Sequence, residues 1–464
     1  MTVNRIIPWV VATALFMDTL DATILNTALP QMAMSFNINV ISLKIALTSY
    51  LLSLAVFTPI SGWLADRFGT RTIFAFAVIF FTLSSVLCGC ATNLPFLVIA
   101  RILQGIGGAL MMPVGRLIIL RTFPKTEMVR VMSFVAMPAL TGPLLGPVVG
   151  GVITTFFSWR WIFFVNVPMG IAGTFLILRY IQNCRAEVSP PFDIPGFCLV
   201  GLGFSTLLIG FESVGEHLLS TPMILFCLLL AVASLMIYVV YQKNVEHPVF
   251  NLGLFQIKTF RIITVSSLCC RLGLSGIPFL LPILFQVGFG WSPLRSGLML
   301  FPLFVGMIAI KPLIRPIFLT YFNFRKILHR NSFVIALLAA SFSMITSTSS
   351  FLLVILGVFL YGVAISLQFT VMNALSYADI PAPQLSQATS IASVMLQLSG
   401  CFSIVVTGLC VNLLVGFQSE LAVGQVGPLQ HTFLILGAIT ALSSWLFLKL
   451  SPEAGQNLRI SPQH

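Results

Sequence analysis

The chain has 464 residues, of which 58% are hydrophobic and only 8% are charged. Soluble domains carry about 25% charged residues, so this composition excludes a soluble globular protein and indicates an integral membrane protein. The net charge of +12 comes from Lys and Arg residues that gather between apolar runs, which membrane topology explains, so we expect no nucleic-acid partner.

Apolar runs of about 20 residues recur along the whole chain, and the segments between them are shorter than a soluble domain of about 50 residues. We therefore predict an all-α polytopic membrane protein with fourteen transmembrane helices. The first eight predicted spans cover residues 7–27, 45–65, 73–92, 96–120, 131–155, 161–182, 195–213 and 221–241. The last six cover residues 261–284, 295–317, 333–347, 349–372, 385–413 and 431–449.

The predicted spans group into two six-span bundles, residues 1–185 and 246–464, with two inserted spans in residues 186–245. A weak internal repeat supports this division, because the loop at 321–326 resembles the loop at 67–71, although it lacks Asp and Gly. Duplicated helical halves are typical of secondary transporters, which rock one half against the other around a central site.

Most of the 24 Lys and Arg residues fall on one side of the predicted membrane, and only Lys44, Arg160 and Arg295 fall on the other. By the positive-inside rule, both termini are expected in the cytoplasm, with the protein in the cell inner (plasma) membrane. The first span lacks a small-x-small cleavage site and carries Asp18 and Asp21. We therefore expect it to stay in the mature protein.

Asp18 and Asp21 are the only acidic residues that we place inside a span, and their spacing puts them on one helical face. Removal from water disfavours the charged form of a carboxyl group, which suits such a group to carry a proton. Asp21 is the first candidate. Asp18 is either a second titrating group or cation contact, or a carboxyl group that only makes structural hydrogen bonds.

Arg101 in the fourth span is expected at the same membrane depth as Asp21, so the two side chains can face each other. Protonation of Asp21 would break such a pair and free Arg101 to change partner. The alternative is a permanent ion pair that joins two helices.

Asp66 follows a helix that runs toward the cytoplasm, and the helix dipole disfavours an anion at such a C-terminus. We expect its partner to be an Arg, or the N-terminus of a helix from the other half, in a contact made in one conformation only. The alternative is that Arg67 and Arg71 only hold the loop on the cytoplasmic side.

Further along, Gly142, Gly146 and Gly150 recur every four residues, which favours close helix approach.

Several stretches resemble motifs of the major facilitator superfamily. Residues 62–71 resemble its loop signature and 97–108 its span-4 motif, while 142–151 resemble the span-5 antiporter motif. Residues 20–30 and 159–168 resemble the fourteen-span drug:proton antiporter branch, within which the likeness is greatest to multidrug-resistance proteins.

The resemblance implies a major facilitator fold, and it implies roles for two motifs. The loop residues expected to gate the cycle are Gly62, Asp66, Arg67, Gly69 and Arg71. The helix residues expected to help seal the pathway are Gly142, Pro143, Gly146, Pro147, Gly150 and Gly151.

Arg271 lies about ten residues into the ninth span, where charge is costly, and we place no acidic residue in any span of that half. Its partner is Asp18 or Asp21, a set of backbone carbonyls, or an anionic group on the substrate. The polar residues that we expect to line the substrate path are Asn26, Gln104, Asn166, Arg271 and Gln286.

The leading functional hypothesis is a proton-coupled exporter of drug-like or amphipathic small molecules that works by alternating access. The alternative is a dedicated exporter of an endogenous metabolite, which Arg271 favours if the metabolite is anionic. No HExxH, GxSxG or Walker motif is present, so we expect no enzyme and no ATP site, and no metal or other cofactor. The expected partners are the substrate, protons and the lipid bilayer, with the protein as a monomer.

Overall fold

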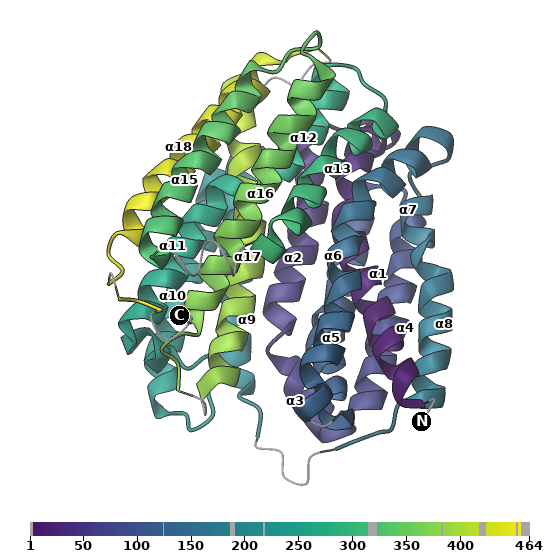
Figure 1. Cartoon of the computed structure of the whole chain (residues 1–464), viewed down its shortest axis with the longest axis vertical. Coiled ribbons are helices and arrows are strands. Elements are labelled where there is room, and N and C mark those ends of the chain that lie inside the picture. The colour runs from purple at the N-terminus through teal and green to yellow at the C-terminus, as the bar shows by residue number, and fades with distance from the viewer. Residues whose placement is uncertain are drawn as a thin grey trace, which may run out of the picture.

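A computed structural model describes residues 3–123, 125–185, 191–216, 219–313, 323–381, 384–416, 424–451 and 453–455. These residues form long helices that run side by side along the molecule, joined by short loops and 3-10 turns (Figure 1). Twelve helices in the described part are long and apolar enough to cross a membrane, and the chain is a multi-pass membrane protein. A bent helix pair makes a thirteenth candidate, and Thr141–Phe156 is a shorter apolar segment. The predicted count of fourteen is therefore not confirmed.

The first part of the chain forms helices that pack mainly on one another. They are α1 (Val3–Phe36), α2 (Lys44–Phe57), α3 (Ile60–Phe68), α4 (Thr70–Gly89), α5 (Leu94–Thr122), α6 (Lys125–Phe156), α7 (Trp161–Phe164) and α8 (Asn166–Tyr180), with the 3-10 turn η1 (Ile41–Leu43) before α2. The predicted span 45–65 bends by 56° between α2 and α3, where Pro59 interrupts the helix.

Two helices follow, α9 (Ile194–Glu216) and α10 (Thr221–Tyr241), and they pack on each other. Helix α9 also contacts α2 and a later helix, α17 (Leu385–Val415). The outer face of α10 exposes large apolar side chains, among them Phe226 and Met236, as expected for contact with lipid. Short 3-10 turns η2 (Gln242–Asn244) and η3 (Leu252–Gln256) lead into the last part.

The last part contains α11 (Lys258–Leu274), α12 (Ile277–Ile283), the π-turn η4 (Leu284–Gly288), α13 (Pro293–Ala309), α14 (Lys311–Leu313), α15 (Phe324–Ser341), η6 (Phe342–Met344), α16 (Phe351–Ser376), α17 and α18 (Gly427–Phe447). Helix α15 begins nine residues before the predicted span 333–347, because the polar residues at its start extend the helix beyond the apolar run. Within the proposed loop repeat, residues 321 and 322 lie outside the described residues.

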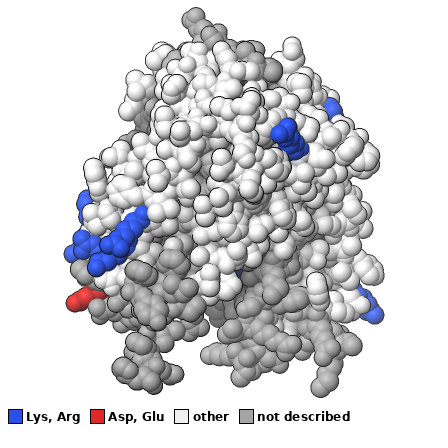
Figure 2. All heavy atoms as spheres, turned by 45° about the horizontal axis from the view of Figure 1, so that its top comes forward, with Lys and Arg blue, Asp and Glu red and all other residues white. Residues whose placement is uncertain are grey.

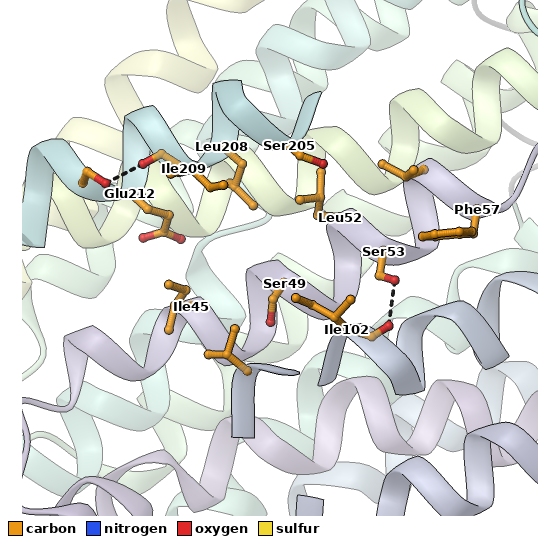
Figure 3. A pocket seen from close by; sticks show the side chains of 13 residues that line it. Ile45, Ser49, Leu52, Ser53, Phe57, Ile102, Ser205, Leu208, Ile209 and Glu212 are labelled. Atoms are coloured by element: carbon orange, nitrogen blue, oxygen red, sulfur yellow. Dashed lines mark hydrogen bonds between the residues drawn. The ribbon is translucent and has the colours of Figure 1, made fainter. Parts of the chain in front are cut away.

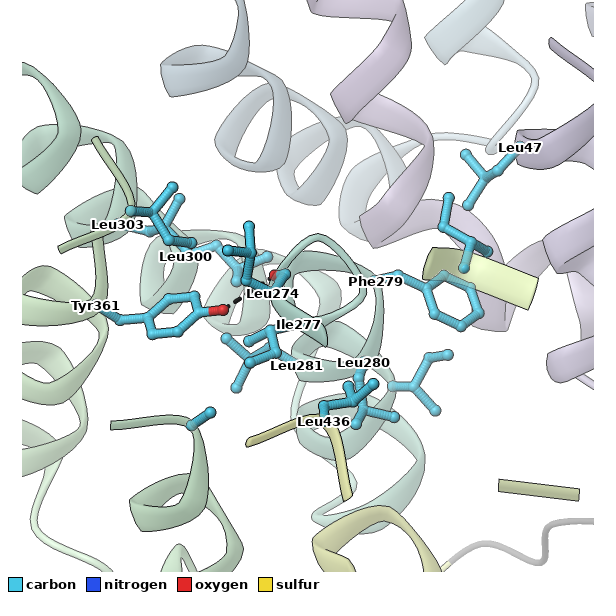
Figure 4. Packing of buried hydrophobic residues seen from close by; sticks show 14 of the residues in the cluster. Leu47, Leu274, Ile277, Phe279, Leu280, Leu281, Leu300, Leu303, Tyr361 and Leu436 are labelled. Atoms are coloured by element: carbon cyan, nitrogen blue, oxygen red, sulfur yellow. Dashed lines mark hydrogen bonds between the residues drawn. The ribbon is translucent and has the colours of Figure 1, made fainter. Parts of the chain in front are cut away.

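A buried apolar core surrounds the break between α11 and α12 (Figure 4). Tyr361 of α16 points into this core, and its hydroxyl donates a hydrogen bond to the carbonyl of Leu274, at 3.0 Å. A helix broken inside a membrane needs such a donor, because lipid offers none to the freed carbonyl. Among the described residues, charged side chains are few on the face shown in Figure 2.

Candidate functional site

Asp21 of α1 lies at the centre of a buried polar cluster that three helices build. Arg101 of α5 places its Nη1 atom 2.5 Å from the Asp21 Oδ2 atom, and neither side chain is exposed. Gln104, one turn further along α5, donates to the other carboxylate oxygen at 2.9 Å. Asn166 of α8 donates to that same oxygen, also at 2.9 Å. The structure therefore brings together four of the predicted site residues, and each contact is one that the ionised carboxylate accepts.

Tyr50 of α2 joins Asp18 to this cluster. Its hydroxyl donates to the Asp18 Oδ1 atom at 2.6 Å. The face of its ring lies 4.2 Å from the Arg101 guanidinium, as in a cation–π contact. Arg101 also donates from Nε to the carbonyl of Ala46, at 3.2 Å. Sequence reasoning missed Tyr50, because one Tyr in an apolar span gives no signal of which helix face it occupies.

A cavity of about 690 Å³, here called the central cavity, connects this cluster to one end of the molecule. Asp18 lines its inner part, and Asp66 and the exposed Arg116 lie toward the end where α3 is drawn in Figure 1. Leu385 and Thr389 of α17 form part of the opposite wall. The cavity thus lies between the first and last parts of the chain and gives Asp18 a route to that end.

The opposite end is closed by contacts between the same two parts. Gln286 in the π-turn η4 donates to the carbonyl of Thr27 in α1, at 3.0 Å. The amide of Leu294 at the start of α13 donates to the Thr155 hydroxyl of α6, at 3.0 Å. Gln286 was predicted to line the substrate path, and in this conformation it bonds to the backbone at the closed end. Asn26, also predicted to line the path, is half-buried in α1, and its side chain makes no hydrogen bond to a described residue.

The predicted gating loop lies at the open end, where Asp66 pairs with Arg121 at the end of α5, at 2.5 Å. The expected partner was an Arg or a helix N-terminus, and we placed that helix in the other half of the chain. In this conformation the partner is an Arg from the same half. Asp66 and Arg121 are 34% and 27% exposed, so the pair lies within reach of water.

The rest of this loop is shaped by Gly69, whose φ of 98° lies in a region that side chains rarely adopt. Asn183 after α8 packs against Gly69 and accepts from the amides of Arg71 and Thr72 at the start of α4. Arg67 lies over the Trp63 ring, 5.2 Å from its centre. Gly62 is open to its surroundings, with no atom near where a Cβ would lie.

The predicted antiporter-motif helix is α6, and it packs along α1. A Cβ added at Gly142, Gly146 or Gly150 would lie 2.2, 2.2 or 2.3 Å from the hydroxyl oxygen of Thr19, Thr23 or Thr27, respectively. The three glycines, here called the glycine stripe, therefore leave room for the three threonines of α1, the helix that carries Asp21.

The other face of α6 packs against α13. A Cβ at Gly151 would lie 2.6 Å from the carbonyl oxygen of Pro293, and a Cβ at Gly297 would lie 2.1 Å from that of Pro147. Pro143 shares the helix with these residues. Helix α6 is thus held between α1 and α13, which come from different parts of the chain.

Arg271 of α11 is buried and makes no ion pair with a described carboxylate. Asp18 and Asp21, the two carboxylates among its predicted partners, are engaged by Tyr50 and Arg101 instead. The Arg271 guanidinium lies 4.0 Å from the centre of the Phe369 ring. It also lines a small cavity of about 30 Å³ together with Thr264, Ser267, Asn373 and Ser376.

The prediction that spans hold no acidic residue besides Asp18 and Asp21 is wrong. Glu212 of α9 is buried, and Lys44, expected in a loop, is buried at the first residue of α2. Their charged atoms lie 3.4 Å apart. Glu212 was overlooked because it falls one residue from the predicted end of its span, where a carboxylate normally reaches water.

The sequence matches the family described as "Major Facilitator Superfamily" over residues 11–404. It is 34% identical over 455 residues to "Putative multidrug resistance protein MdtD" of Enterobacter sp., covering 97% of this chain and 96% of the relative. The protein of that name from Pectobacterium atrosepticum is 35% identical over 452 residues, covering 96% and 95%.

Solved transporter structures share the fold. A D-xylose-proton symporter superposes with a TM-score of 0.70 at 16% identity, covering 97% of this chain and 98% of that one. A POT family transporter in complex with 5-aminolevulinic acid gives a TM-score of 0.71 at 14% identity, covering 96% of each chain. At these identities the likeness establishes the fold alone.

Proposed function

The chain belongs to the major facilitator superfamily, as its motifs predicted, and on that premise we propose that it exports drug-like or amphipathic small molecules in exchange for protons. It is a transporter and not an enzyme. The names of its relatives support multidrug efflux. Proton coupling is our proposal, and it rests on the Asp21 cluster.

The contact that carries this proposal is the buried pair between Asp21 and Arg101. Protonation of Asp21 removes the charge that holds Arg101, Gln104 and Asn166 around it, so these contacts weaken and Arg101 relies on its other acceptors, the Gln104 side chain and the Ala46 carbonyl. Such a rearrangement couples proton binding to the packing of α1, α5 and α8. A permanent ion pair is the alternative, and it predicts that transport does not depend on an ionisable group at residue 21.

The central cavity supports alternating access, in which the two halves rock so that the site faces each side in turn. The conformation described here is open at the Asp66 end and closed at the Gln286 end. We propose that Asp66, Arg121 and the loop around Gly69 change contacts between the two states. We propose that the glycine stripe of α6 keeps the pathway sealed.

We further propose the topology that these roles require. The chain has fourteen spans: two six-span halves, residues 1–185 and 246–464, and an inserted pair within residues 186–245. The packing of α9 on α10, and the bent pair of α2 and α3 as one span, support this count. Both termini lie in the cytoplasm, the protein lies in the inner membrane, and it works as a monomer because the central cavity lies within one chain.

The test uses everted membrane vesicles that contain the wild type or Asp21→Asn and are energised to an acid interior. A pH-sensitive dye reports proton release as each compound of a panel is added. We expect at least one apolar or amphipathic compound to release protons from wild-type vesicles only. Arg179→Lys, at the exposed end of α8, is the matched control and should behave as the wild type.

Equal responses from the wild type and Asp21→Asn would contradict the role of Asp21. If no drug-like compound gives a response, the multidrug proposal fails.

A second candidate is an exporter of an anionic metabolite, and Arg271 is the observation that favours it. A buried guanidinium without a carboxylate partner among the described residues can pair with an anionic group on a substrate. Proton release that only organic anions trigger, and that Arg271→Gln abolishes, would support this candidate over the first.

A further inference from the structure

A second cavity, here called the lateral cavity, lies outside the central cavity, between α9 and helices α2 and α5 (Figure 3). Its volume is about 280 Å³, and apolar side chains such as Leu52, Phe57 and Leu208 form most of its wall. Ile102 and Ile209 line it while remaining 38% and 47% exposed on the outer surface of the protein. The lateral cavity therefore opens sideways between α5 and α9, toward hydrocarbon and not toward water.

One end of the lateral cavity is polar, because Glu212 of α9 belongs to its wall. The Thr48 hydroxyl holds one carboxylate oxygen at 2.8 Å, and the Lys44 ammonium lies 3.4 Å from the other. Lys44 does not line the cavity. It packs against α17, where a Cβ at Gly408 would lie 2.5 Å from the Lys44 Cδ atom. A molecule in the cavity therefore meets the carboxylate and not the ammonium.

Lys44 has another place for its charge. It is the first residue of α2, so its flexible stem can carry the ammonium toward water at that end of the molecule. Glu212 has a shorter side chain that Thr48 holds in place. A cation that reaches the lateral cavity can therefore pair with the Glu212 carboxylate while the Lys44 ammonium moves toward water.

We propose that the lateral cavity binds a lipophilic cation that enters from the bilayer. The apolar body lies along α2 from Phe57 toward Ile45, a length of about 18 Å at 1.5 Å per residue, which suits a single alkyl chain. The cationic group pairs with Glu212 and displaces Lys44. This site is separate from the Asp21 cluster and does not depend on the proposed proton coupling.

The test uses the full-length protein in lipid nanodiscs and a decyltrimethylammonium probe that carries a photoreactive diazirine on its chain. Mass spectrometry then locates the labelled residues. We expect labels on α2 and α9 around Leu52 and Leu208, and much weaker labelling by an alcohol with the same chain. Loss of the charged contact in Glu212→Gln should lower the cation's labelling by about tenfold.

Two matched variants separate a site from general contact with lipid. Ser205→Phe fills the lateral cavity and should abolish labelling there, whereas Thr206→Phe changes the next residue of α9, which does not line the cavity, and should not. Asp21→Asn should label as the wild type does, which keeps this test independent of the proposed transport mechanism. If Glu212→Gln fails to fold because the Lys44 ammonium loses the Glu212 charge, the double variant Lys44→Met, Glu212→Gln removes both charges and serves in its place.

Equal labelling of the wild type and the Glu212 variant would overturn the proposal. So would equal labelling by the cation and the alcohol, which would make the cavity a site for hydrocarbon alone.

Discussion

A single aromatic ring connects the two carboxyl groups of α1. Tyr50 donates to Asp18, and its ring face contacts the guanidinium of Arg101, which pairs with Asp21. A change of protonation at either carboxylate therefore changes the contacts that hold the Tyr50 side chain in place. Asp18 lines the central cavity while Asp21 is buried behind it, so a proton arriving from the cavity meets Asp18 first.

We expect Tyr50→Phe and Asp18→Asn to have non-additive effects on stability, because both remove the same hydrogen bond. Double-mutant cycles inside membranes give couplings of about 0.6 to 1.7 kcal/mol, and we expect a value in this range. Thermal unfolding of the two single variants and the double variant in detergent measures it. Additive effects would show that the contact contributes nothing to stability.

Contacts between spans were predictable from the sequence where they depend on how deep each residue lies in the membrane. The prediction that Asp21 and Arg101 lie at the same depth and can face each other agrees with their contact, and Gln104 and Asn166 also bond to Asp21. It was silent on helix rotation, so it missed Tyr50 and could not say whether Asn26 faces the cluster. Glu212 and Lys44 were missed because both lie near predicted span ends, where a one-turn error decides between water and burial.

At the scale of elements, the structure shows which helices the regularly spaced glycines of α6 contact. Three glycines of α6 face three threonines of α1, and two further close approaches join α6 to α13. Spacing alone could not say which helix the glycine stripe would meet, because any close neighbour would explain it. Which Arg or helix N-terminus would pair with Asp66 could not be identified from the sequence, for a related reason. The C-terminus of a helix shows that an anion needs a partner, but not which helix supplies it.

Gly146→Ala should destabilise the protein by about 1–3 kcal/mol, because its Cβ would overlap the Thr23 hydroxyl. Removing that hydroxyl in Thr23→Ala should recover part of the loss in the double variant, since the nearest remaining atom, the Thr23 Cβ, lies at 3.0 Å. Thermal unfolding of the three variants checks this. A double variant no more stable than Gly146→Ala would show that other contacts set the cost.

The Asp66–Arg121 pair is partly exposed, so it should add little to stability, about 0–1 kcal/mol. If it belongs to the gate, Asp66→Asn should still slow substrate-dependent proton release by about tenfold, a barrier change of about 1.4 kcal/mol. The charge reversal Asp66→Arg with Arg121→Asp should restore part of the rate. A loss of rate matched by an equal loss of stability would point to a structural role alone.

At the scale of the whole molecule, the two halves meet closely at one end and part around the central cavity at the other. The class of fold was predictable from apolar runs and motif order. The conformation was not, because every major facilitator protein must visit both the open and the closed arrangement at each end, and composition is the same in both.

Cysteine accessibility tests this conformation. Ser393 of α17 lines the central cavity, whereas Ser403 of the same helix is fully buried. In a background in which the exposed Cys90 and Cys198 are replaced by Ser, a membrane-impermeant maleimide should label Ser393→Cys in everted vesicles and not in right-side-out ones. Ser403→Cys should stay unlabelled in both. Labelling of Ser393→Cys only from the opposite side would invert the orientation proposed above.

The threonine hydroxyls that fill the glycine stripe all bond to carbonyls of their own helix, so α1 and α6 meet by shape and without a hydrogen bond through these side chains. These threonine–glycine contacts repeat every four residues, about 6 Å along the helix axis. If α1 slides along α6, the threonines face glycines again only after a shift of that full length. Small axial slips are therefore blocked. Helices α1 and α6 must therefore move together as a rigid unit. On this side of the molecule, the interface between α6 and α13 is then the one that separates when the closed end opens.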